Sequence, residues 1–247
     1  MREVWRMWNY STMVVLTVLT AGLFAAILIP FKGIPLIPGV TELRPANVIP
    51  VVLGLLFGPA GAWGAALGNL LGDFFGTLGI ASFFGFWGNF VAAYLTYKIW
   101  GNVSLERFSQ HWWRFFGCVL LGSVACAQVI GYGLEVLHLL PFSVIAVAIL
   151  ANNFITPCIL GPLLLRLLYP RVSRWDLQWQ ELMDPADQSS GPFPRLGKCL
   201  VWLGGIGGYL VGLGTSLGLA ASWGVNISVA EGVTPFMVML IVGCFFL

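Results

Sequence analysis

Eight apolar runs, separated by turns or short polar segments, constrain the fold of this chain more than any other feature. A helix of about 20 apolar residues is long enough to cross a bilayer. Only 9% of the residues are charged, whereas soluble domains carry roughly 25%. We therefore expect an all-α integral membrane protein with eight spans. The runs cover about residues 12–30, 46–58, 59–78, 83–100, 114–139, 141–169, 197–222 and 234–247.

The distribution of basic residues predicts the orientation of the spans. Arg2 and Arg6 precede the first apolar run, which is too long for a signal-peptide core and predicts an uncleaved span. Basic residues recur in the segments 101–113 and 170–198, whereas the opposite loops hold only Lys32 and Arg44. Because basic loops remain cytoplasmic, we expect a cytoplasmic N-terminus.

The polar segment after residue 170 divides the chain into two membrane parts. We expect a six-span bundle over residues 1–170, a cytoplasmic linker over 171–196 and an additional transmembrane hairpin over 197–247. The hairpin is rich in glycine, which lets helices pack closely.

The stretch 43–79 contains a stripe of small residues and an acid. Gly58-Pro59-Ala60-Gly61 is a turn signal between two apolar arms. After it, small residues recur at every fourth position, which places them on one helix face. They are Ala60, Gly64, Gly68, Gly72 and Gly76. The stripe favours close helix packing, and an acid inside such a helix, Asp73, suggests a functional site.

Polar side chains gather at similar depths in the outer half of the predicted bundle. At about 1.5 Å per residue, Asp73 lies roughly 9 Å below the outer end of its span, and Asn89 is at a similar depth. Gln128 lies roughly 15 Å down and the pair Asn152 and Asn153 roughly 17 Å down. Since polar groups in hydrocarbon face the bundle interior or a cavity, this clustering predicts a pocket that opens to the outside.

Each of these residues also has a structural interpretation. The amides, Asn69 included, could simply form hydrogen bonds that hold neighbouring helices together. Arg44 could form an ion pair with Asp73 that holds the outer loop closed, which would make the pair structural and not part of a ligand site. Trp87 could stack on a planar ligand or pack in the core.

The sequence carries no nucleotide-binding or hydrolase motif. The five cysteines lack a CxxC pair, and His111 and His138 lack ligand-like partners, so we expect no metal and no cofactor. A net charge of +2 gives no reason to expect nucleic acid. An intramembrane enzyme would have only Asp73 and Glu135 for chemistry, so we expect no enzyme.

The six-span bundle, its long outer loop and the stretch 43–79 resemble the substrate-binding membrane subunits (S-components) of energy-coupling factor (ECF) transporters. Ala21-Gly22-Leu23-Phe24-Ala25 resembles the AxxxA docking motif of that family, and Arg-Pro-Ala-Asn and Gly-Asn-Leu-Leu-Gly-Asp resemble the segments that follow. The resemblance covers about residues 10–170; the additional hairpin departs from it. It implies a protein of the bacterial cytoplasmic membrane that captures a vitamin or related micronutrient from outside.

The same resemblance implies a transmembrane coupling subunit and two cytoplasmic ATPases as partners, with Ala21 and Ala25 at the docking surface. The substrate is then a small planar metabolite. The residues predicted to bind it are Asp73, Asn69, Asn89, Asn153, Asn152, Gln128, Arg44, Glu42 and Trp87. The alternative is a structural or assembly subunit of a larger membrane complex, which the additional hairpin favours.

Overall fold

The protein is a helical bundle with one small β-hairpin. The computed structural model describes residues 1–37, 41–188, 191–222, 224 and 226–247. The first part of the chain forms α1 (Arg2–Arg6), η1 (Met7–Asn9), α2 (Ser11–Phe31), β1 (Pro35–Ile37), β2 (Thr41–Glu42), η2 (Pro45–Asn47), α3 (Val48–Phe57), α4 (Pro59–Asp73) and α5 (Ala81–Trp100). The second part forms η3 (Leu105–Gln110), α6 (Trp112–Val136), α7 (Phe142–Arg174), α8 (Trp179–Leu182), α9 (Pro194–Trp202), η4 (Leu203–Gly207), α10 (Gly208–Ser216), α11 (Leu219–Ser222) and α12 (Val229–Phe246).

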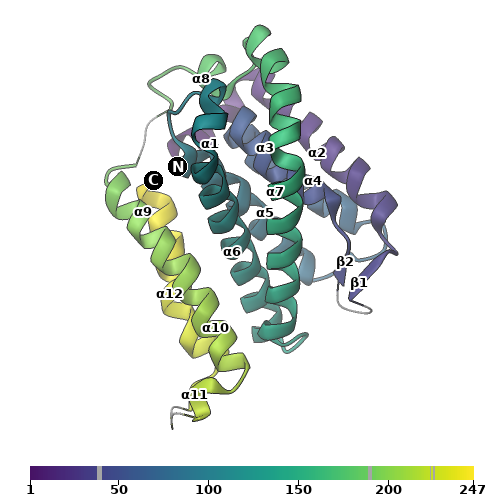
Figure 1. Ribbon diagram of the computed structural model, residues 1–247, viewed down its shortest axis with the longest axis vertical. Helices are drawn as coiled ribbons and strands as arrows, with labels where there is room; N and C mark the ends of the chain where they lie inside the picture. Colours follow the sequence, from purple (N-terminus) through teal and green to yellow (C-terminus); the bar gives the residue numbers. More distant parts are fainter. Residues whose placement is uncertain (38–40, 189–190, 223, 225) are drawn as a thin grey trace.

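The two ends of the bundle differ in what they carry. The N-terminus, the C-terminus and α8 lie at one end, and the antiparallel pair β1–β2 lies toward the other (Figure 1). This division matches the two sets of loops that the basic residues separate. We call the end with β1–β2 the hairpin end.

Five described helices are long and apolar enough to cross a membrane: α2, α6, α9–α10 taken together, α12 and the long helix that begins with α7. α3 is a shorter apolar helix, and α4 ends at Asp73, five residues earlier than expected. The chain is therefore a multi-pass membrane protein, but only five of the eight expected spans meet these criteria in the described residues.

The small-residue face of α4 packs directly against α2. A Cβ atom added at Gly64 would lie 2.4 Å from Thr20 Cβ, and one at Gly68 would lie 2.8 Å from the carbonyl oxygen of Ala21. Gly72 faces Leu28 in the same way. Glycine is required at 64 and 68 because a side chain there would push against the α2 backbone, which confirms this part of the stripe as a packing surface. The last predicted member, Gly76, lies beyond α4 with φ +118°, and no atom lies within 4 Å of an added Cβ there, so the stripe ends at Gly72.

A sharp turn joins α3 to α4 at the predicted position. Gly58 has φ +53°, a left-handed value that favours glycine, and Pro59 occupies the first turn of α4, where no amide proton is needed. The turn directs α4 back along α3, so that Asp73 at its end reaches the hairpin end of the bundle.

The C-terminal helices α9, α10 and α12 pack together and lie against α6, on the side of the bundle away from α2 (Figure 1). Gly204 is close to the α12 backbone, since an added Cβ would lie 2.6 Å from the amide nitrogen of Leu240. The Tyr94 hydroxyl donates to the carbonyl oxygen of Cys244 at 2.8 Å. The additional helices therefore leave the outward face of α2 uncovered by any described residue.

Candidate functional site

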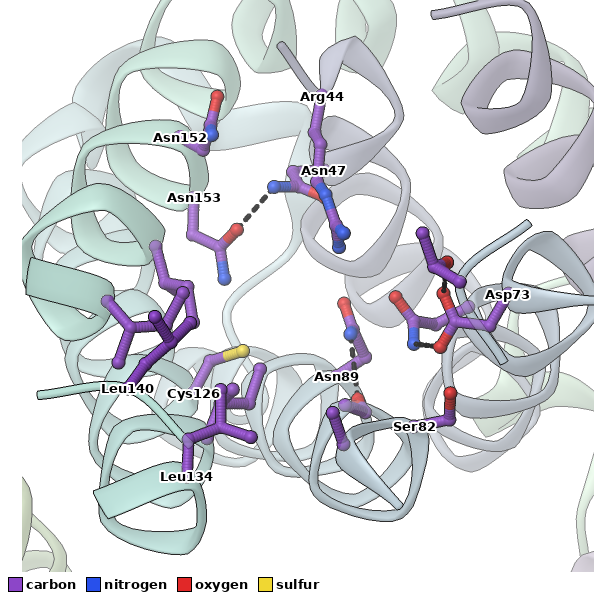
Figure 2. Close-up of a pocket in the computed structure, with 17 residues that line it drawn as sticks. Arg44, Asn47, Asp73, Ser82, Asn89, Cys126, Leu134, Leu140, Asn152 and Asn153 are labelled. Atoms are coloured by element: carbon purple, nitrogen blue, oxygen red, sulfur yellow. Dashed lines mark hydrogen bonds between the residues drawn. The ribbon is translucent and has the colours of Figure 1, made fainter. Parts of the chain in front are cut away.

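A cavity of about 210 Å³ opens among α4, α5, α6, α7 and the segment before α3, in the half of the bundle toward the hairpin end (Figure 2). Its lining is polar on one part and aliphatic on another. The lining residues are Arg44, Asn47, Asn69, Asp73, Thr77, Ala81, Ser82, Gly85, Asn89, Cys126, Ile130, Leu134, Leu140, Ile145, Ile149, Asn152 and Asn153.

Asp73 ends α4 and is held by two hydrogen-bond donors and one ion pair. Asn69 Nδ2 donates to Asp73 Oδ2 at 3.2 Å, and Thr77 Oγ1 donates to Oδ1 at 3.1 Å. Lys32 Nζ lies 3.8 Å from Oδ1 and donates to Thr77 Oγ1 at 2.5 Å. The cation paired with Asp73 is thus Lys32; within the described residues no ion pair joins Asp73 to Arg44, which corrects the ion pair suggested by the sequence.

Lys32 follows the end of α2 and is largely removed from solvent. Its side chain is 9% exposed and that of Asp73 is 8% exposed. Burial lowers the pKa of the Lys32 ammonium below its usual value, and the Asp73 carboxylate counteracts this change. The ion pair offsets part of the cost of removing both charges from water.

Two polar atoms of the cavity residues have no hydrogen-bond partner among the described residues. They are Asn69 Oδ1, an acceptor, and Arg44 Nε, a donor. Both atoms are buried, and such atoms are costly unless a partner arrives. Arg44 extends toward the middle of the cavity, between Asn47 and Asn89 (Figure 2). Both residues line the cavity, so these two atoms are candidate contacts for a ligand.

Consecutive asparagines of α7 hold the segment that leads into α3. Asn153 Oδ1 accepts a hydrogen bond from Asn47 Nδ2, and Asn152 Nδ2 donates to the carbonyl oxygen of Glu42 at 3.0 Å. Ser123 Oγ donates to the carbonyl oxygen of Asn153 at 2.7 Å, which links α6 to the same place. These bonds fix Arg44, which lies between the two anchored residues.

Gly85 keeps the space beside the Asn69–Asp73 pair open. A Cβ added there would lie 2.8 Å from Asn69 Nδ2 and 3.9 Å from Asp73 Oδ2. Asn89, one turn later on α5, donates its Nδ2 to the carbonyl oxygen of Gly85 at 2.8 Å. Its Nδ2 is thereby engaged in its own helix, so its Oδ1 is the atom left for other contacts.

Six of the nine residues predicted to bind a substrate line the cavity: Asp73, Asn69, Asn89, Asn152, Asn153 and Arg44. The other three lie elsewhere. Gln128 is fully buried but faces α10, where an added Cβ at Gly208 would lie 2.2 Å from its Nε2. Glu42 contributes its backbone carbonyl to Asn152. Trp87 packs against two phenylalanines: its ring centroid lies 5.2 Å from that of Phe86 and 5.8 Å from that of Phe90.

Several residues that line the cavity are not among those predicted from the sequence. Asn47 belongs to the Arg-Pro-Ala-Asn stretch, so the resemblance of that stretch was a usable signal. Thr77 and Ser82 lie in or near a short link whose fold the pattern does not specify. The aliphatic residues of α6 and α7 look like any other apolar residue of a span.

The two predicted docking residues are turned inward. Ala21 and Ala25 are 4% and 8% exposed and belong to the buried side of α2. The outward side carries Gly22 and Ala26, again four residues apart, and no atom lies within 4 Å of an added Cβ at Gly22. A small-residue pair is therefore present on the free face of α2, one position later than expected.

Among the described residues, no group of three or more His, Cys, Asp or Glu side chains could hold a metal ion. The donors and acceptors around the cavity are instead amides, the hydroxyls of Thr77 and Ser82, one guanidinium and one paired carboxylate. Such a set suits an organic molecule with a hydrogen-bonding edge.

Comparison with known proteins identifies the family. No curated protein and no solved structure matches the chain. Residues 14–170 match the family described as QueT transporter, whose members are S-components of ECF transporters for a queuosine precursor. The match covers the helical bundle and all the cavity residues and ends before the C-terminal helices. The chain therefore belongs to the QueT transporter family of ECF S-components.

Proposed function

We propose that this protein captures a queuosine precursor from outside the cell and hands it to an ATPase-driven ECF coupling module. The base of queuosine is a 7-deazaguanine, so its precursors share a planar ring with a guanine-type edge. A cavity of about 210 Å³ is below the roughly 300–1,000 Å³ of sites for drug-sized ligands and suits one small heterocycle.

The lining complements the polar edge of guanine. That edge carries donors at N1 and at the 2-amino group, next to the O6 acceptor. Asp73 Oδ2 and the unpartnered Asn69 Oδ1 are acceptors for the donors, and the unpartnered Arg44 Nε is a donor for O6. The aliphatic part of the lining, which includes Ile130 and Ile149, would cover the ring faces. The observation that carries the proposal is this set of unsatisfied polar atoms at one cavity in a QueT family member.

Ligand selectivity tests the proposal. Purified protein in nanodiscs should bind 7-deazaguanine about 100-fold more tightly than 7-deazaadenine, because the adenine edge presents a donor where Arg44 needs an acceptor.

Asp73→Asn should weaken 7-deazaguanine binding about 100-fold, since it removes a charged acceptor. Isothermal titration calorimetry measures both quantities. The control is Asp176→Asn, an exposed acid between α7 and α8 that does not line the cavity. Equal binding of the two bases, or an unchanged Asp73→Asn variant, would contradict the proposal.

We propose that the outward face of α2 docks onto the transmembrane coupling subunit, with the N-terminus in the cytoplasm and the cavity opening outward. Gly22 and Ala26 would let a partner helix approach closely. The C-terminal helices lie on the other side of the bundle, so they do not obstruct this face (Figure 1). This arrangement supports a transport role over a scaffold role.

A docking variant separates coupling from binding. Gly22→Leu combined with Ala26→Leu should reduce ATP-dependent uptake about tenfold or more, because bulky side chains hold the partner helix away. Ligand affinity of the isolated protein should not change. The matched control is Gly214→Leu in α10, which also has no atom within 4 Å of an added Cβ. Normal uptake by the α2 variant would place the docking surface elsewhere.

A further inference from the structure

Another cavity, of about 220 Å³, lies between η3 and the last turns of α7. α7 ends beside α8, at the end of the bundle away from β1–β2 (Figure 1). One part of the lining is apolar and consists of Leu105, Phe108 and Leu165. The other part is polar and includes Glu106, Arg166 and Tyr169. Such a lining suits a ligand that is partly apolar and partly charged.

The cavity lies at the level where a bilayer changes from hydrocarbon to headgroups. At about 1.5 Å per residue, the part of α7 from Phe142 to Arg166 is roughly 36 Å long, whereas the hydrocarbon core is about 30 Å thick. Directly after η3, Trp112 and Trp113 begin α6 with ring centroids 3.8 Å apart, and Trp113 is 72% exposed. Exposed tryptophans are typical of the membrane interface, so the cavity is within reach of lipid headgroups.

An exposed aliphatic stripe on α7 leads to this cavity. Its members recur at every fourth position and are all more than half exposed: Ile155, Ile159, Leu163 and Leu167. Arg166 and Pro170 line the cavity and come three positions after Leu163 and Leu167, so they continue the same helix face. An acyl chain along the stripe would place its headgroup at the cavity.

Arg166 is the guanidinium that this cavity offers to an anion. Among the described residues, its exposed side chain has no hydrogen bond and no ion pair. Arg171, by contrast, donates from Nη1 to the carbonyl oxygen of Leu167 at 2.6 Å and is engaged in its own helix. A guanidinium can bind two oxygens of a phosphate at once. Basic residues in the last turn of α7 favour an anionic lipid over a zwitterionic one.

We infer that this cavity binds an anionic phospholipid, with its phosphate at Arg166 and one acyl chain along the α7 stripe. Glu106 would accept a hydrogen bond from a headgroup hydroxyl, which a phosphatidylglycerol carries. The cavity shares no lining residue with the cavity beside Asp73. The inference therefore does not depend on the proposed substrate.

Competition between two lipids with the same acyl chains tests the headgroup. Detergent-purified protein is mixed with equal amounts of phosphatidylglycerol and phosphatidylcholine, and native mass spectrometry measures which lipid stays bound. The wild-type protein should retain phosphatidylglycerol about tenfold over phosphatidylcholine. Arg166→Gln should reduce this preference about fivefold, the change expected for one basic residue near an anionic headgroup.

Two further variants show whether the charge is responsible. Arg166→Lys keeps the positive charge and should retain most of the preference for phosphatidylglycerol. Arg195→Gln removes an exposed arginine of α9 that does not line the cavity, so it is the matched control and should leave the preference unchanged. Equal retention of the two lipids by the wild type, or an equal loss of preference in the control, would overturn the inference.

Thermal unfolding distinguishes a lipid from a free phosphate. Phosphatidylglycerol added in detergent should raise the melting temperature of the wild type by a few degrees, because a ligand stabilises the folded state that binds it. Inorganic phosphate and glycerol 3-phosphate carry the anion without an acyl chain and should not. Equal stabilisation by inorganic phosphate would show a phosphate site and contradict the lipid assignment. Calorimetry with 7-deazaguanine reports on the other cavity, so a failure there leaves this inference intact.

Discussion

Replacement of Gly85 by valine is expected to weaken ligand binding about 100-fold, which corresponds to about 2.7 kcal/mol. An added Cβ would lie 2.8 Å from Asn69 Nδ2, so the amide must move and its bond to Asp73 must lengthen or break. The two further methyl groups would occupy the space that a ligand needs. Calorimetry with 7-deazaguanine measures the loss of affinity.

The fold should tolerate this change, because the nearest atom is the end of a flexible side chain and not backbone. The melting temperature should therefore stay close to that of the wild type. Gly117→Val in α6 is the matched control, since no atom lies within 4 Å of an added Cβ there. Unchanged affinity in the Gly85 variant would show that the ligand does not use this part of the cavity.

Gly64→Val is expected to cause the largest loss of stability, about 3 kcal/mol or more. The added Cβ would lie 2.4 Å from Thr20 Cβ and 2.8 Å from the carbonyl oxygen of Thr17. Backbone atoms cannot move aside as a flexible side chain can, so α2 and α4 must separate. Thermal unfolding in detergent measures the effect.

A valine on the opposite face of the same helix pair provides the comparison. Gly22→Val adds the same side chain to α2, but in open space. It should leave the melting temperature of the isolated protein nearly unchanged. Similar destabilisation by both variants would mean that the α2–α4 contact is not the cause.

The grouping of polar residues toward one half of the bundle could be predicted from the sequence, because the rise per residue of a helix is constant. Counting residues placed Asp73 and Asn89 roughly 9 Å and Asn153 roughly 17 Å below the outer end of their spans. All three residues line one cavity. The turn at Gly58 could also be predicted from its residues. These features depend on local geometry that does not change with tertiary packing.

Rotation of a helix about its own axis could not be predicted. α2 is apolar on all sides, so no polar face shows whether Ala21 or Gly22 points outward. For the same reason the sequence did not show that Gln128 faces α10 and not the cavity. Helix rotation is determined by side-chain packing between helices, which a single sequence does not reveal.

The ion-pair partner of Asp73 was missed for a different reason. Lys32 comes just after a helix and reaches Asp73 only because the chain turns there. Arg44 is the other basic residue of the same loop, and residue type alone does not distinguish the two as partners of Asp73. Loop geometry, not residue type, decides which cation is close.

The two asparagines that anchor the segment before α3 have unequal evolutionary consequences. Asn152 bonds to a peptide carbonyl, which every amino acid at position 42 would supply. Asn153 bonds to the amide of Asn47, which few replacements could imitate. The bond from Asn152 therefore places no constraint on the side chain at position 42, whereas among natural homologues positions 47 and 153 should change together or not at all.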